Sequence, residues 1–261
     1  GGVANGYPRQ DGFDITVASE IMAICSLAES YSDLRDRIGD IVVGWKRDRK
    51  TPVTAREINA VGSIMALLRD AIKPNLVQTS EGQPAIVHMG PFGNIAHGCS
   101  SILADNLAMN CGDYVVTEAG FGADLGFEKF MDIKVRQGGP EPSLAVIVTT
   151  IRGLKWHGGV TISEMESPNP EAVRKGSENL KNALRIVNMY GLQAVVAINR
   201  FPTDSKDEIT MVKEVAKSAG AFSVQEADGF MSGGDGMTDL ATAVVEAANQ
   251  PTEVKLLYED K

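Results

Sequence analysis

Three segments carry the residues of this sequence that are best suited to chemistry, and each follows an apolar run. In the first, residues 90–98, small residues would let the backbone approach a ligand closely, and Asn94 and His97 offer polar side chains. The alternative is structural: the glycines and the proline only turn the chain, and His97 bonds a carbonyl group in the core. The spacing of the residues alone favours this structural alternative.

The second segment, residues 120–126, reads Gly-Phe-Gly-Ala-Asp-Leu-Gly and could bind an anion. A glycine loop between a strand and a helix presents backbone N–H groups to a negatively charged group. The loop contains no lysine, so its composition alone is a weak phosphate motif. Glu118 and Asp124 could assist a metal ion or orient the loop, although helix capping explains Asp124 equally well.

The third segment, residues 199–204, places Phe201 and Pro202 at the end of an apolar run. An aromatic side chain beside a proline at a strand end is rigid and half exposed, which suits stacking on a flat heterocycle. A partly buried core position for Phe201 is the alternative that the residues leave open.

The elements that must position these segments alternate between helical and strand patterns. Continuous apolar runs predict strands that are buried on both faces, as parallel sheets require. The expected strands are residues 41–45, 85–89, 114–117, 144–150, 194–198 and 222–225. The expected helices are residues 17–28, 29–39, 58–72, 100–110, 128–135, 169–190, 206–219 and 237–248. This alternation predicts a doubly wound, mostly parallel α/β sheet, in which ligands bind outside the carboxyl ends of the strands.

Composition excludes several classes of function. The net charge of −9 and the pI near 4.9 argue against nucleic acid and anionic membranes as partners. The three cysteines form no Cys-x-x-Cys pair, which favours a reducing, cytoplasmic location. The three histidines form no metal-ligand motif and no Gly-x-Ser-x-Gly sequence is present, so the sequence predicts neither a metal site nor a serine hydrolase.

Five strings of the sequence resemble those of the formate–tetrahydrofolate ligase family, also called formyltetrahydrofolate synthetases. They occur in the family's order and at roughly its spacing, at residues 12–28, 73–79, 90–99, 117–126 and 197–204. The resemblance implies a sheet of the P-loop NTPase type. It also implies that residues 1–190 form part of a nucleotide-binding α/β domain and residues 191–261 part of a second, folate-binding α/β domain.

The resemblance further implies an activity. The family uses ATP with Mg²⁺ to formylate tetrahydrofolate with formate, through formyl phosphate, and gives 10-formyltetrahydrofolate. A possible monovalent cation and a homo-oligomer, generally a tetramer, belong to the same expectation. In this family the loop that matches Gly120, Phe121 and Gly122 lies near the nucleotide phosphates and formyl phosphate.

The folate residues are carried over from the third segment. Phe201, with Pro202 and Asn199 beside it, matches the aromatic position that stacks on the pterin. Its usual partner is a tryptophan shortly before a Gly-Gly-x-Gly string, and here the nearest aromatic residue before residues 233–236 is Phe230. The sequence therefore departs from the family in both residue type and spacing at the second wall of the folate pocket.

Two signatures of the family are missing. The sequence contains no Gly-Lys dipeptide, so it has no phosphate loop of the Gly-Lys-Thr type, and the family's second glycine-rich signature is also absent. We therefore expect a central part of a longer enzyme that is inactive alone. A subunit of a split ligase and a non-catalytic folate-binding module are the alternatives, both needing a partner with a phosphate loop for catalysis.

Overall fold

The structure is a computed structural model that describes residues 19–259, and these fall into two compact units. Unit 1 contains residues 19–77 and 84–118, and unit 2 contains residues 78–83 and 119–259. The first part of the resembling string at residues 12–28, residues 12–18, lies outside the described residues.

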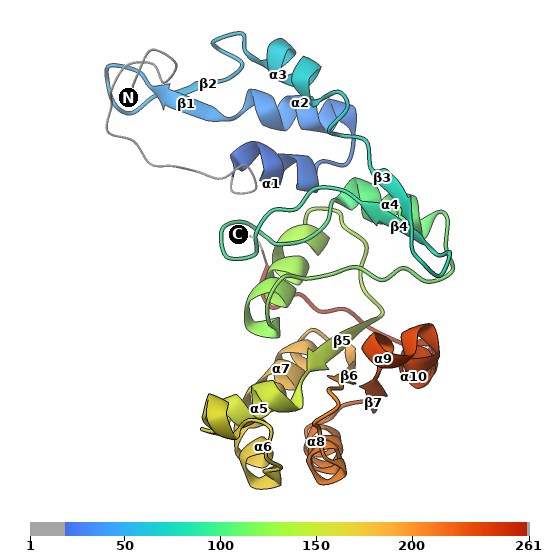
Figure 1. Cartoon of the computed structure of the whole chain (residues 1–261). Helices are drawn as coiled ribbons and strands as arrows, with labels where there is room; N and C mark the ends of the chain where they lie inside the picture. The colour runs from blue at the N-terminus through green and yellow to red at the C-terminus, as the bar shows by residue number, and fades with distance from the viewer. Residues whose placement is uncertain (1–18, 260–261) are drawn as a thin grey trace, which may run out of the picture. The chain divides into compact units, whose positions relative to one another are not determined.

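Unit 1 consists of short helices and two hairpins (Figure 1). Its elements are α1 (Glu20–Leu27), α2 (Tyr31–Gly39), β1 (Val42–Trp45), β2 (Pro52–Thr54), α3 (Val61–Leu68), β3 (Asn75–Gln78), β4 (Pro84–Val87) and α4 (Ile102–Met109). Ser30 separates α1 from α2 because its extended backbone and side-chain oxygen cap the second helix. Leu34 and Ile38 of α2 pack with Met65 of α3 in the core of this unit.

Two expectations for unit 1 are wrong. The segment 114–117 is not a strand, and its Val116 is 88% exposed. A strand needs a neighbouring strand to bond its backbone N–H and C=O groups, and no described strand pairs with this segment. The expected strand at 85–89 is present as β4, but it pairs with β3 in a two-stranded sheet and joins no parallel sheet. The expected helix at 58–72 is confirmed only as the shorter α3, which follows Asn59 in a left-handed conformation (φ +58°).

Unit 2 is built on a three-stranded parallel sheet. The strands are β5 (Leu144–Thr149), β6 (Gln193–Asn199) and β7 (Ser223–Ala227), in the order β5-β6-β7. Its helices are η3 (Ala123–Phe127), η4 (Phe130–Val135), α5 (Ile151–His157), η5 (Ile162–Glu164), α6 (Pro170–Gly176), α7 (Glu178–Met189), α8 (Lys206–Ser218), α9 (Gly229–Ser232), η6 (Gly233–Met237) and α10 (Thr238–Ala248). The prediction of an α/β fold with a parallel sheet is confirmed.

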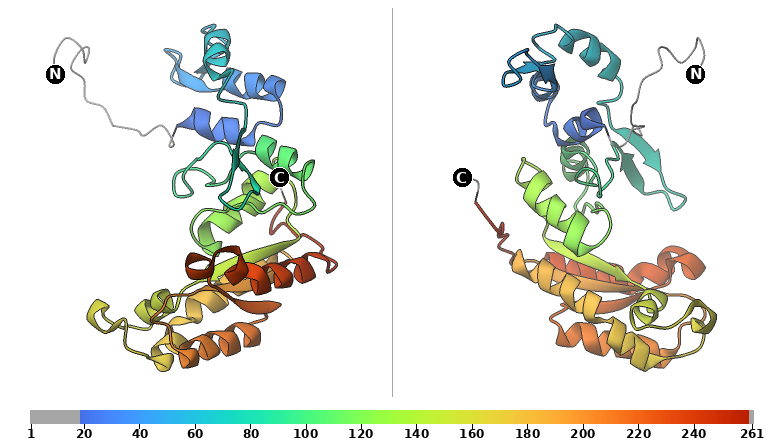
Figure 2. Two further views of the ribbon diagram at one scale, coloured as in Figure 1. Left: turned by 45° about the vertical axis from the view of Figure 1, so that its right-hand side comes forward. Right: turned by 90° about the vertical axis from the view of Figure 1, so that its left-hand side faces the viewer.

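Helices cover both faces of this sheet, as Figure 2 shows for α10 on one side and α7 and α8 on the other. The side chains of Val195 and Ala197 in β6 pack with Leu240 of α10. The central strand β6 is thus buried on both faces, as expected. The same expectation is wrong for β5, because β5 is an edge strand and Val148 is 66% exposed.

The helices of unit 2 differ from the sequence pattern in several places. Helices α5 and α9 occur where no helix was expected. The expected helix at 169–190 is divided into α6 and α7 at Ser177. At the end of α6 a Cβ atom on Gly176 would lie 1.8 Å from the carbonyl oxygen of Leu154, so this glycine allows α5 and α6 to pack closely. The expected loop at 120–126 ends early, because η3 already begins at Ala123.

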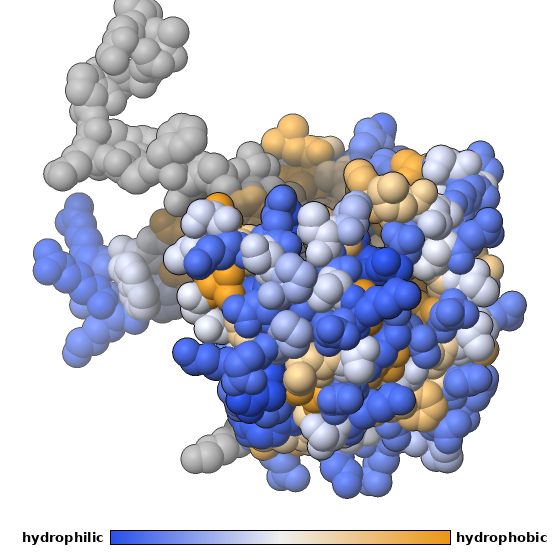
Figure 3. All heavy atoms as spheres, turned by 60° about the horizontal axis from the view of Figure 1, so that its bottom comes forward, coloured by the Kyte–Doolittle hydropathy of each residue, from blue (hydrophilic) through white to orange (hydrophobic). Residues whose placement is uncertain are grey.

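The side of unit 2 at the bottom of Figure 1, which comes forward in Figure 3, is mostly hydrophilic with scattered apolar groups.

Candidate functional site

The carboxyl ends of the parallel strands lie at one edge of the sheet. β5 leads there into Thr150 and α5, β6 leads into the loop 200–205, and β7 leads into α9. Loops at such an edge form the usual ligand site of an open α/β sheet. This edge contains Phe201, Pro202 and Asn199 of the sequence prediction.

A tight turn holds Phe201 at this edge. The Phe201 N–H donates to Oδ2 of Asp204 (2.8 Å), and the Asp204 N–H donates to the Phe201 carbonyl oxygen (3.0 Å). The phenyl ring is half-buried, and its centroid lies 5.1 Å from the guanidinium carbon of Arg152 in α5. Pro202 and Asn199 are both exposed beside it.

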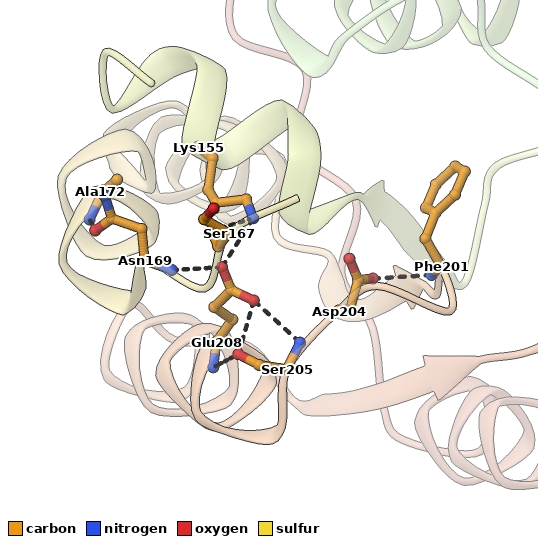
Figure 4. Close-up of polar contacts among 8 residues, drawn as sticks. All are labelled: Lys155, Ser167, Asn169, Ala172, Phe201, Asp204, Ser205 and Glu208. Atoms are coloured by element: carbon orange, nitrogen blue, oxygen red, sulfur yellow. Dashed lines mark hydrogen bonds and ion pairs between the residues drawn. The ribbon is translucent and has the colours of Figure 1, made fainter. Parts of the chain in front are cut away.

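A buried ion pair fixes the far end of the same loop. The Lys155 Nζ atom lies 3.0 Å from Oε1 of Glu208, and both side chains are almost completely buried. Glu208 also accepts hydrogen bonds from the backbone N–H groups of Asn169 (2.9 Å) and Ser205 (3.0 Å), while Lys155 donates to the Ser167 carbonyl oxygen (3.2 Å). Figure 4 shows the Glu208 carboxylate among these donors and the Phe201 ring directed away from them. The donors offset the cost of burying the two charges.

The two carboxylates of the loop respond differently to burial. Burial raises the pKa of Asp204, although the Phe201 N–H and the nearby Lys155 and Arg152 partly oppose that rise. Burial also acts to raise the pKa of Glu208, but hydrogen bonds from Asn169, Ser205 and Lys155 outweigh it and hold that pKa below its usual value. Glu208 therefore stays ionised at neutral pH and keeps its partners.

Phe230 follows β7 in the one-turn helix α9, and it is 90% exposed. Phe230 therefore follows β7, the neighbour of the strand β6 that precedes Phe201. Near the end of β7, the Glu226 carboxylate pairs with Arg200 (Nη1 to Oε2, 3.3 Å) and with Lys213 (Nζ to Oε1, 2.7 Å). These contacts tie the ends of β6 and β7 together.

The Gly120–Phe121–Gly122 loop lies elsewhere in unit 2. Phe121 has a left-handed backbone (φ +64°) and is 73% exposed. The η3 turn that follows contacts the end of α7 that precedes β6, where the ring of Phe127 meets Tyr190 edge-on at 5.4 Å. That end of α7 belongs to the amino edge of the sheet, about 20 Å along β6 from its carboxyl end. The structure therefore does not bring this loop together with Phe201.

The remaining sequence candidates belong to other segments of the chain. Asn94 is exposed and His97 is buried, and both belong to unit 1. Glu118 and Asp124 are exposed, and no group of three or more His, Cys, Asp or Glu side chains within residues 19–259 could hold a metal ion.

Sequence reasoning missed three residues of the site: Arg152, Lys155 and Glu208. A signal for Glu208 was available, since Ser205-x-x-Glu208 is a capping-box sequence and the structure forms both of its bonds. No local pattern marks Lys155 as the partner of Glu208, because the two residues are 53 positions apart in sequence.

Comparison with known proteins assigns the family. The family profile described as formate–tetrahydrofolate ligase matches residues 1–261. Curated proteins named formate–tetrahydrofolate ligase are 54% identical in Sphingobium sp. SYK-6, 53% in Nocardioides sp. JS614 and 51% in Staphylococcus aureus strain Newman. These matches cover 99–100% of this chain and 46–47% of the relatives, so the chain spans about half their length. No helix among the described residues is long and apolar enough to cross a membrane. The chain belongs to the formate–tetrahydrofolate ligase family.

Proposed function

We propose that this chain takes part in the ATP-dependent formylation of tetrahydrofolate by formate, and that it contributes the pterin-stacking wall of the folate site. The observation that carries the proposal is Phe201, fixed by its turn at the carboxyl edge of the sheet in a chain that matches the family along its whole length. Pro202 stiffens the loop, and Asn199 and Phe230 lie on the same edge.

The reaction follows from the weakness of formate as an electrophile. Phosphoryl transfer from ATP turns the carboxylate into formyl phosphate and releases ADP. The N10 amine of the folate then attacks the formyl carbon, the bond to the phosphate oxygen breaks, and inorganic phosphate leaves with loss of the amine proton. In this scheme Phe201 binds and orients the pterin.

The phosphate-handling part of the proposal depends on the sequence string alone. Gly120, Phe121 and Gly122 would cradle formyl phosphate with their backbone N–H groups, but the loop lies at the amino edge in this structure. A P-loop NTPase sheet, wound on both faces, with a nucleotide domain at 1–190 and a folate domain at 191–261, belongs to the same proposal. So do a cytoplasmic location, a tetramer, and dependence on Mg²⁺ and a monovalent cation, to which we assign no residue.

A binding role without catalysis is the second candidate. Residues 1–261 contain no Gly-Lys dipeptide, so in either role a phosphate-loop lysine would come from outside them. A subunit of a split ligase would show the same property, and adding a partner that carries a phosphate loop would restore its activity.

Binding of tetrahydrofolate to the purified chain tests the proposal. We expect calorimetry to detect binding that Phe201→Ala weakens by about tenfold, because stacking of one heterocycle on an aromatic residue contributes about 1–3 kcal/mol. Phe222→Ala is the matched control, since Phe222 is a partly exposed phenylalanine at the amino edge. Equal effects of the two substitutions would refute the role of Phe201. Formate-dependent ATP turnover by the chain alone would refute the expectation that it is inactive by itself.

A further inference from the structure

We propose that Arg152 is a positioning residue for Phe201, and that by covering one face of the phenyl ring it biases the other face toward an electron-rich, reduced pterin. This inference rests on the proposed function for the identity of the ligand. The positioning contact itself rests on the structure alone.

The contacts of Arg152 place it against the Phe201 loop. Its guanidinium carbon lies 5.1 Å from the ring centroid, within the range of a cation–π contact. Its positive charge also acts on the carboxylate of Asp204, which accepts the Phe201 N–H. Arg152 Nη2 also donates to Glu166 Oε1 (3.2 Å), which gives the guanidinium a second contact besides the ring.

Two features of Arg152 are not explained by the stability of its own helix. It is the second residue of α5, where the positive end of the helix dipole disfavours a cation. Its Nε atom is buried and has no hydrogen-bond partner among residues 19–259. A buried donor without a partner is costly, and the guanidinium that carries it lies over the Phe201 ring.

The position of Arg152 has a consequence for the ligand. A phenyl ring has two faces, and the guanidinium occupies one, so a heterocycle can stack only on the other. The cation draws π-electron density toward itself and leaves the free face less negative. An electron-rich ring, such as a tetrahydropterin, then stacks better than the electron-poor ring of oxidised folate.

Binding of both ligands to three variants tests this bias. We expect Arg152→Met to weaken tetrahydrofolate binding by about three- to tenfold and oxidised folate by less, so that the ratio of the two dissociation constants falls toward one. Arg152→Lys keeps a cation and should restore most of this preference. Arg174→Met removes an exposed arginine of α6 that pairs with Glu171, and it should leave both constants unchanged.

A readout without ligand separates this inference from the proposed function. In a ¹H–¹⁵N spectrum of arginine side chains, the Hε signal of Arg152 should be shifted upfield by the Phe201 ring and should return in Phe201→Leu. Absence of that shift would overturn the positioning role, whether or not folate binds. A shift that is present with no folate binding would refute the proposed function and keep the positioning role. Equal losses for the two folates in Arg152→Met would overturn the bias.

Discussion

Replacing Glu208 by glutamine removes one charge from the buried pair beneath the Phe201 loop while keeping nearly the same volume. The variant leaves the Lys155 ammonium in a site where both side chains are almost fully buried and where Ser167 provides its other partner through a carbonyl oxygen. Breaking a buried ion pair at one end costs about 3–5 kcal/mol, because the remaining charge has lost its compensation.

Part of the loss should remain when the charge is removed from both sides. Glutamine has a single acceptor oxygen, so it can accept from the N–H group of Asn169 or from that of Ser205 but not from both. The double variant Lys155→Met, Glu208→Gln should therefore recover part of the lost stability, because no charge is left unpaired. The assay is urea unfolding of the chain at pH 7, read from the midpoint and slope. Glu171→Gln on the exposed surface of α6 is the control and should leave the midpoint unchanged.

The pH dependence gives the same pair a second test. The pKa of Glu208 is lower in the folded chain than its usual value near 4.5, so the folded state binds fewer protons than the unfolded state as pH falls below about 5. The contribution of Glu208 to stability is complete above that pH and is lost as pH falls through the folded pKa. Glu208→Gln should reduce this acid sensitivity. A loss at pH 7 below about 1 kcal/mol, or a double variant as unstable as the sum of the single variants, would refute the reasoning.

Three further predictions concern other parts of the chain. Burial lowers the pKa of His88 below 6.5, so the stability of the chain should decrease as pH falls below about 6.5, and urea midpoints at pH 7 and 5 should differ less in His88→Gln. Gly126→Ala would place a Cβ atom 1.5 Å from the carbonyl oxygen of Gly120, so it should lower the free energy of unfolding in urea by more than about 2 kcal/mol. As a control, Gly62→Ala in helix α3 has open space around the new Cβ atom and should raise the free energy of unfolding by up to about 1 kcal/mol. Tyr190→Phe removes a 2.6 Å hydrogen bond to an aspartate and should lower the free energy of unfolding by about 1–2 kcal/mol. Burial also raises the pKa of Tyr190, so in an ultraviolet titration of the wild type this phenol should stay un-ionised at pH values where exposed tyrosines ionise.

Strands and helices with strong periodicity were predictable in unit 2. The run at 194–198 predicted β6 because a central parallel strand is apolar on both faces, and the capping-box sequence at 205–208 is where α8 begins. The segment 114–117 has the same apolar character but no partner strand among the described residues, so its sequence predicted a strand that the structure does not form. The residue types of a segment indicate its preference for an extended backbone. Whether it becomes a strand depends on a partner segment elsewhere in the chain, which the local sequence does not specify.

The sequence by itself determined the family, the α/β class and Phe201 as a candidate, because these depend on local strings and on periodicity. Tertiary structure decided what surrounds that ring. Arg152 meets Phe201, and Lys155 meets Glu208, only because β5 and β6 pair in parallel and deliver α5 and the 200–205 loop to the same edge. It also decided that Gly120 and Phe201 lie at opposite edges. Contacts between residues about 50 positions apart depend on strand order and register, and no local pattern of residue types encodes either.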